Sequence, residues 1–62
     1  MTDDLFCVEG FVDNNTVAPE FSAKSLNAAD AVFNERVSRG DVEVTLWRVG
    51  SGLPAFLKGV NQ

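Results

Sequence analysis

The chain has 62 residues, enough for one domain with a thin core, because a chain of this length buries only about 60% of its unfolded surface. A composition of 45% hydrophobic and 23% charged residues, with five Phe and one Trp, excludes a disordered tail. Nine acidic and five basic residues give a net charge of −4, which works against non-specific binding to nucleic acid or to an anionic membrane. We therefore expect a single folded domain over residues 1–62 whose small core favours self-association.

The first predicted element is a strand at residues 5–12, after a polar start at residues 1–4 that we expect to be frayed. Aromatic and β-branched residues dominate this segment, and both types favour strands. The next residues, Asp13, Asn14 and Asn15, are typical of a tight hairpin turn. The two faces of the strand carry Leu5, Cys7, Glu9 and Phe11 on one side, and Phe6, Val8, Gly10 and Val12 on the side that we expect to face the core.

Residues 16–23 are predicted to form the returning strand of the hairpin. Pro19 lies within this segment and cannot donate a backbone hydrogen bond to a neighbouring strand. We therefore expect an edge strand or a bulged strand here.

Residues 25–39 are predicted to form a helix. Arg36 and Arg39 lie in its last turns, where the helix dipole favours positive charge. Its apolar residues recur at steps of three and four and so form one stripe that must be covered by a sheet. This stripe consists of Leu26, Ala29, Val32, Phe33 and Val37.

The ends of this helix carry local signals. Ser25 and Asn27 can each cap the first turn, and we favour Asn27 because Asp30 three residues later completes a capping box. With Asn27 as the cap, Leu26 would lie just outside the helix. Gly40 can adopt the left-handed conformation that ends a helix.

Residues 42–49 show the clearest strand alternation in the chain. Its two faces carry Val42, Val44 and Leu46 on one side, and Glu43, Thr45, Trp47 and Val49 on the other.

After a turn at residues 50–52, residues 53–60 are ambiguous, because Pro54 and Gly59 argue against a central strand and against a long helix. They are interpreted as a last strand or as a tail over residues 53–62.

Together these elements predict an α+β domain in which one helix packs on an antiparallel sheet of three or four strands, in the order strand, strand, helix, strand and a possible last strand. The sheet face under the helix is expected to consist of Phe6, Val8, Val12, Val44 and Leu46.

The chain offers little material for catalysis or metal binding. It has no His and no Tyr, and its single cysteine, Cys7, cannot form an internal disulfide. Glu9, Glu20 and Glu43 are interpreted as ordinary charged residues on a solvated sheet face. No segment approaches the ~18 apolar residues of a membrane span, and no basic leader precedes an apolar run. We therefore expect a cytoplasmic protein that is not an enzyme, with no metal, no cofactor and no membrane association.

One helix covers one sheet face, so the apolar side chains on the other face need a different cover. The tail residues Leu53, Phe56 and Leu57 are one candidate. A protein partner is the other, and it is the one that we favour: a non-catalytic interaction module that uses its open sheet face or a sheet edge, as a homodimer or as an accessory subunit of a larger protein. The expected interface residues are Leu5, Cys7, Phe11, Trp47 and Val49.

A nucleic-acid-binding protein is the alternative. Trp47 would stack a base while Arg36, Arg39 and Arg48 hold phosphates. Three observations argue against this alternative. The net charge is acidic. The helix dipole already explains Arg36 and Arg39, and strand alternation turns Arg48 away from Trp47. A third hypothesis is a small acidic inhibitor of the viral type, which blocks a nucleic-acid-binding protein.

Overall fold

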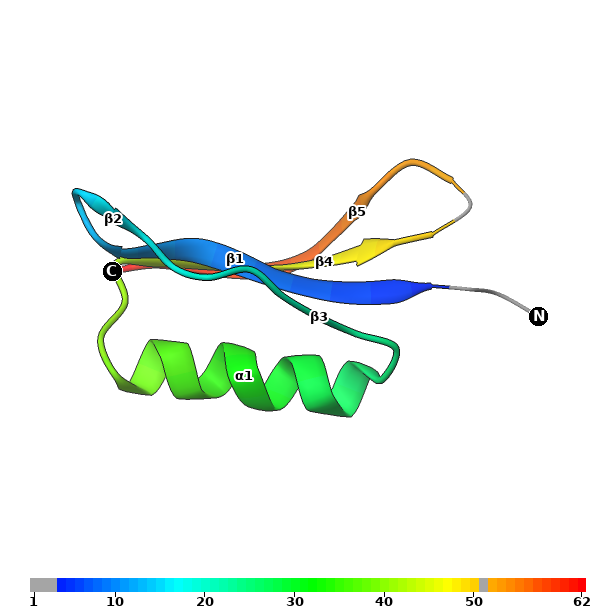
Figure 1. The fold of residues 1–62 in the computed structure, drawn as a ribbon, viewed down its shortest axis with the longest axis horizontal. Coiled ribbons are helices and arrows are strands. Elements are labelled where there is room, and N and C mark those ends of the chain that lie inside the picture. Colours follow the sequence, from blue (N-terminus) through cyan, green and yellow to red (C-terminus); the bar gives the residue numbers. More distant parts are fainter. Residues whose placement is uncertain (1–3, 51) are drawn as a thin grey trace.

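The computed structural model describes residues 4–50 and 52–62, and in it one helix packs against one face of an antiparallel sheet (Figure 1). The strand order is β2-β1-β4-β5, and β3 pairs with β1 on the same side as β2. The α+β prediction is confirmed, with five strands in place of three or four. The elements are β1 (Leu5–Asp13), β2 (Thr16–Val17), β3 (Phe21–Ala23), α1 (Leu26–Ser38), β4 (Glu43–Val49) and β5 (Ala55–Asn61).

Two predictions fall on residues outside the described ranges. They are the frayed start, which includes residues 1–3, and the turn at residues 50–52, which includes Ser51.

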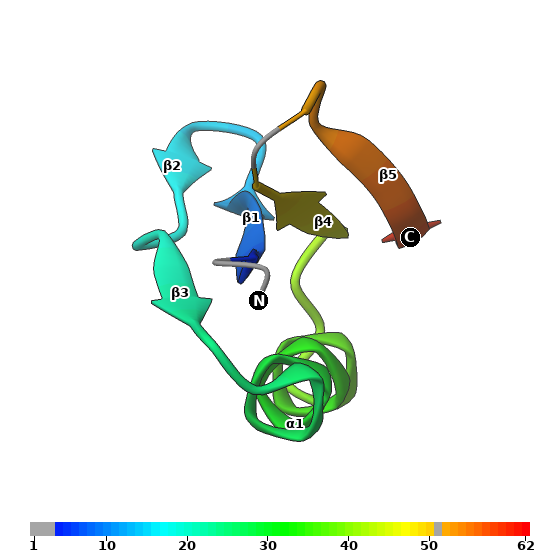
Figure 2. The same cartoon turned by 90° about the vertical axis from the view of Figure 1, so that its right-hand side faces the viewer.

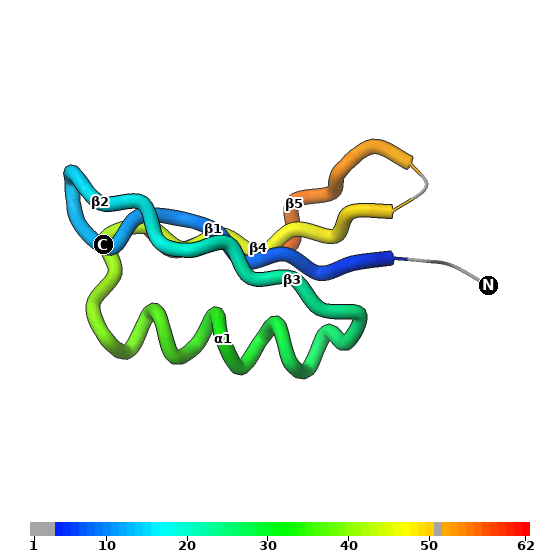
Figure 3. The backbone as a smooth tube through the Cα atoms, viewed as in Figure 1, coloured from blue at the N-terminus to red at the C-terminus, as the bar shows by residue number. Residues whose placement is uncertain are grey.

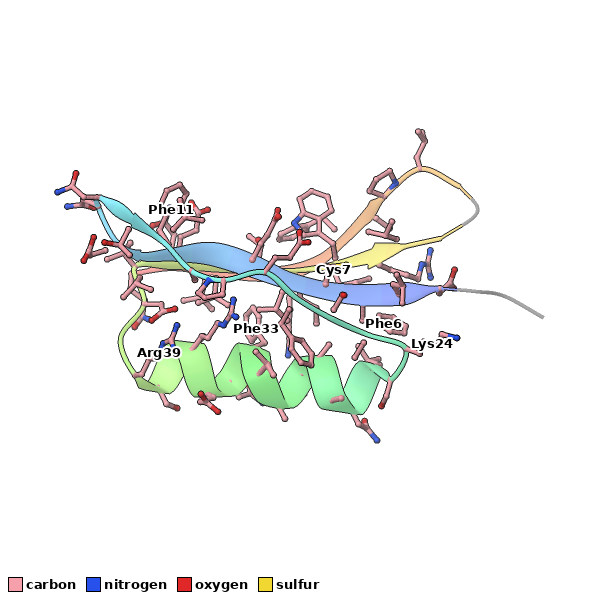
Figure 4. The ribbon with its side chains drawn as sticks, in the orientation of Figure 1. Phe6, Cys7, Phe11, Lys24, Phe33 and Arg39 are labelled. Atoms are coloured by element: carbon pink, nitrogen blue, oxygen red, sulfur yellow. The ribbon has the colours of Figure 1, made fainter. Side chains whose placement is uncertain are left out.

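The core lies between α1 and the two central strands. In the β1–β4 ladder Val8 pairs with Leu46, and because paired residues share a sheet face, both side chains point at the helix. Figure 4 shows Phe33 of α1 reaching up between the helix and the sheet. The buried cluster consists of Val8, Ala29, Phe33, Val44 and Leu46, with Phe6, Phe21, Val32, Val37 and Val60 packed against it.

Two residues that were expected in the core lie outside this cluster. Leu26 is 46% exposed, because it is the first residue of α1 and helical side chains point back toward the helix N-terminus, here beyond its end. Val12 is only half-buried, at the end of β1 where the register with β2 shifts between Phe11 and Asp13.

Gly10 allows the two central strands to approach closely. Its φ is +151°, and a Cβ atom built on it would lie 2.0 Å from the backbone oxygen of Glu43 on the neighbouring strand. A side chain at this position would therefore collide with backbone, which a rotamer change cannot relieve.

The hairpin after β1 forms as predicted. The Asn15 amide donates to Oδ1 of Asp13 over 2.8 Å, which fixes the turn. The returning chain follows β1 as one path (Figure 3), and the expected interruption at Pro19 divides it into β2 and β3.

The helix begins two residues earlier than the favoured Asn27 cap predicts. Ser25, not Asn27, is the N-cap: Ser25 has extended backbone angles, and its hydroxyl oxygen accepts a hydrogen bond from the Ala28 amide over 3.3 Å. Leu26 consequently lies inside the helix, and the predicted capping box of Asn27 with Asp30 is wrong.

The C-terminal end of α1 is closed by a Schellman motif. Gly40 has φ +95°, its amide donates to the Val37 carbonyl, and the Asp41 amide donates to the Arg36 carbonyl, both over 3.1 Å. The guanidinium of Arg39 then donates to both carboxylate oxygens of the buried Asp41, over 2.7 and 3.0 Å.

Arg36 lies in the last turn of α1, as predicted, and it also makes contacts that the sequence did not predict. It is buried under the sheet, where its guanidinium donates to the carbonyl oxygens of Val8 and Pro19. It therefore joins α1 to β1 and to the interruption between β2 and β3, and does not act as a solvated charge at the helix end.

Replacing Asp41 with Asn is expected to flatten the acid limb of the stability profile. The Arg39 guanidinium holds the pKa of Asp41 below its ordinary value, so the carboxylate stabilises the fold above about pH 4, and this contribution is lost as the pH falls through the lowered pKa. Thermal melts of both proteins between pH 7 and pH 2 would test this. The difference in melting temperature between the parent and the variant should shrink toward pH 2. A difference in melting temperature that stays constant with pH would contradict the prediction.

The ambiguous C-terminal segment is a strand. β5 lies beside β4 in the sheet (Figure 2). The two strands pair antiparallel, with a register shift between Leu46 and Trp47. On the helix side Lys58 forms an ion pair with Asp30, and its Nζ lies 4.6 Å from the centroid of the Phe33 ring. Within residues 4–50 and 52–62 no helix is long and apolar enough to cross a membrane.

Candidate functional site

The sheet face that points away from α1, here called the open face, carries all five residues predicted as an interface. Figure 4 shows Phe11 on this side of the sheet and Phe33 on the other. The strand pairings assign to the open face the side chains of Leu5, Cys7, Glu9, Phe11, Val17, Glu43, Thr45, Trp47, Val49 and Phe56.

The β1–β4 register brings most of the predicted set together. Cys7 lies opposite Trp47, and Leu5 lies opposite Val49, so four of the five predicted residues form one patch across the central ladder. Phe11 lies farther along β1, opposite Glu43 on β4 and Val17 on β2. The sequence predicted this set because side chains alternate strictly between the faces of a strand.

An aromatic pair extends the patch toward the sheet edge. The rings of Trp47 and Phe56 meet edge to face, with centroids 5.6 Å apart and planes at 79°. The Phe56 ring also lies over Gly59, whose absent Cβ would be 3.1 Å from it. Nε1 of Trp47 is buried and has no acceptor among the described residues, and the Trp47 side chain as a whole is half-buried.

The C-terminal segment covers only part of the open face. Phe56 packs on Trp47, as the tail hypothesis expected, but it remains exposed itself. Leu53 is 93% exposed and Leu57 is also exposed. Phe56 therefore belongs to the patch. The sequence predicted it only as a candidate cover, because its pairing with Trp47 depends on the β4–β5 register.

A cavity of about 300 Å³ opens on this face. Its walls are almost entirely apolar, because the two glutamates that line it contribute mainly carbon atoms, and Glu20 reaches it from the interruption between β2 and β3. Neither Glu20 nor Pro54 was expected at a site. Glu20 lies in the connection between β2 and β3 and Pro54 in the connection between β4 and β5, and no local signal places either connection beside the β1–β4 ladder. The lining residues are Cys7, Glu9, Glu20, Trp47, Val49 and Pro54.

The thiol of Cys7 lies in this cavity. Burial raises its pKa above the ordinary value, and the negative charges of Glu20 and Glu9 raise it further. The thiol therefore remains protonated at neutral pH, and a protonated thiol is a weak nucleophile.

The positively charged side chains lie on the helix side of the sheet. Lys24 and Arg39 project there in Figure 4, Arg36 is buried there, and Lys58 contacts Phe33. Arg48 pairs with Phe6 and so shares the helix-side face. These five are all the Lys and Arg residues of the chain.

The nucleic-acid set is consequently not brought together. Trp47 is on the open face, whereas Arg36 is buried, Arg39 is paired with Asp41, and Arg48 points to the opposite face. Among residues 4–50 and 52–62, no three Cys, Asp or Glu side chains are grouped so that they could hold a metal ion. In comparisons with known proteins, the chain matches no protein-family model, no curated protein and no solved structure.

Proposed function

We propose that this protein is a non-catalytic protein-binding module that docks a partner on its open face, either as a homodimer or as an accessory subunit of a larger protein. The observation that supports this is the apolar surface left on one side of a two-layer fold. Phe56 is 57% exposed and extends the central patch of Cys7 and Trp47, and Val17, which is 67% exposed, lies opposite Phe11 farther along the same face. Contiguous exposed apolar surface is typical of protein interfaces.

The composition of the patch suits an interface. Aromatic residues are enriched among the side chains that contribute most to binding, and the edge-to-face contact of Trp47 with Phe56 holds both rings in place before a partner arrives. Preorganised side chains lose less conformational entropy on binding.

The sheet edge at β5 offers a second mode of contact. β5 ends the strand order on that side, so its outer backbone groups are available for a strand from another chain. The opposite edge is divided into β2 and β3 at Pro19, which leaves a poor template for strand addition.

The weak nucleophilicity of Cys7 and the lack of any His to activate it support a non-catalytic role. Nucleic-acid binding has less support, because the arginines do not gather around Trp47. The single cysteine is consistent with a reducing compartment, and we propose the cytoplasm.

The test compares proteins captured from the native cells by the parent chain and by a variant carrying Phe11→Ser and Phe56→Ser. Both side chains are exposed, so these changes alter the open face more than the core. Loss of an aromatic anchor is expected to weaken binding by about 2 kcal/mol, or roughly thirtyfold. Light scattering at micromolar concentration measures whether the partner is a second copy.

Leu26→Ser is the matched control, because it removes a similarly exposed apolar side chain from the helix on the other side of the molecule. The proposal requires that this control keeps the partner that the double variant loses. A monomer that captures the same proteins in all three forms would refute it.

A further inference from the structure

The open face is negatively charged as well as apolar. Glu9 and Glu43 point to it from β1 and β4, and Glu20 reaches it beside Cys7. All five Lys and Arg residues lie on the other side of the sheet, as described above. None of the five Lys and Arg side chains, all of which lie within the described residues 4–50 and 52–62, therefore neutralises these three carboxylates on their own face.

Glu9 and Glu20 border the cavity mainly through their carbon atoms, together with the indole of Trp47. Glu9 and Glu20 are both exposed, and the raised pKa of Cys7 reflects both of their charges, so both act on the same small volume. A flat aromatic surface with carboxylates beside it suits a planar cation, because a guanidinium can stack on the ring and donate hydrogen bonds to carboxylate oxygens at the same time.

We propose that the cavity binds an arginine side chain of a partner protein, with the guanidinium on Trp47 and paired with Glu9 and Glu20. This inference rests on the proposed function and identifies the chemistry of the partner: a segment with an arginine beside apolar residues that cover the rest of the patch. The neighbouring walls, Val49 and Pro54, contact the aliphatic stem of the arginine.

A second copy of this chain is a poor occupant of the same face. Two open faces packed together would bring three carboxylates from each copy into one interface, and none of the Lys and Arg side chains in the described part of either copy would lie there. Removing unpaired carboxylates from water is costly, whereas arginines of a different chain compensate for this cost.

The experiment titrates the ¹⁵N-labelled protein with Nα-acetylarginine amide and, in parallel, with Nα-acetylcitrulline amide, which has nearly the same shape and no charge. The resonances followed are the Trp47 indole N–H and the amides of Cys7 and Glu9. We expect arginine to bind about tenfold tighter than citrulline at low salt, and this preference to shrink as salt is added.

The variant Glu9→Gln with Glu20→Gln is expected to reduce the preference to about twofold or less. Glu43→Gln is the matched control, because it removes a carboxylate from the same face outside the cavity, and it should leave most of the preference in place. Equal affinities for the two compounds in the parent protein, or a preference that survives in the double variant, would overturn the proposal.

The outcomes separate this inference from the proposed function. A dimer that is dissociated by Phe11→Ser with Phe56→Ser would keep the proposed function and refute the arginine site, because a second copy would then cover the cavity. A selective response to arginine in a protein whose captured partners ignore the open-face variant would keep the site and refute the proposed function.

Discussion

Replacing Phe33 with Ala is expected to lower the free energy of unfolding by about 3–5 kcal/mol, the usual result of truncating a buried Phe. Phe33 is 4% exposed and lies at the centre of the cluster between α1 and the β1–β4 ladder. The ammonium of Lys58 also lies over its ring and would lose that contact. Because domains of this size are stabilised by little more than such an amount, much of the variant should be unfolded at room temperature.

Urea denaturation followed by Trp47 fluorescence measures this change. Leu26→Ala is the control, since it truncates an apolar residue of the same helix that is 46% exposed, and it should cost less than about 1 kcal/mol. If the urea midpoint of Phe33→Ala equalled that of the parent, the core would be wrongly assigned.

Replacing Gly10 with Ala is expected to cost about 2–6 kcal/mol, from about 1–3 for backbone strain and about 1–3 for steric overlap. The added Cβ would lie 2.0 Å from the Glu43 carbonyl oxygen, so β1 and β4 would have to separate. Separation of these strands also pulls Cys7 away from Trp47. We therefore expect the variant to lose the cavity as well as stability.

Gly52→Ala is the matched control, because a Cβ at Gly52 has no atom within 4 Å and the residue is exposed. Its effect should stay within about 0.5 kcal/mol. Equal unfolding midpoints for the two variants would show that the close contact of β1 with β4 does not constrain residue 10.

The elements that the sequence predicted correctly are those specified by local periodicity. β4 alternates between half-buried and buried side chains from Glu43 to Trp47, and α1 has an apolar stripe and a glycine stop at Gly40. The open-face residues on these strands follow from alternation alone, because once Val8 and Leu46 face the helix, Cys7 and Trp47 must face away.

The features that the sequence did not predict depend on contacts between distant segments. Burial of Arg36 requires the carbonyls of Val8 and Pro19 to converge above the helix, and no spacing in the chain signals this convergence. Phe56 and Glu20 join the site through strand registers that only the folded sheet defines. The choice of Ser25 over Asn27 as the cap was open because both residue types accept the same hydrogen bond.

The position of the central ladder also has a consequence for the order of folding. Its paired residues are far apart in the chain, from Phe11 with Glu43 (43 − 11 = 32) to Leu5 with Val49 (49 − 5 = 44), whereas β1 with β2 and β4 with β5 are local hairpins. Local hairpins close faster than distant pairs, so we expect the joining of the two hairpins to limit the folding rate. One wall of the cavity comes from each hairpin, so a half-folded chain does not present the site. A partner that binds there therefore selects chains whose folding is complete, and stabilises them by mass action.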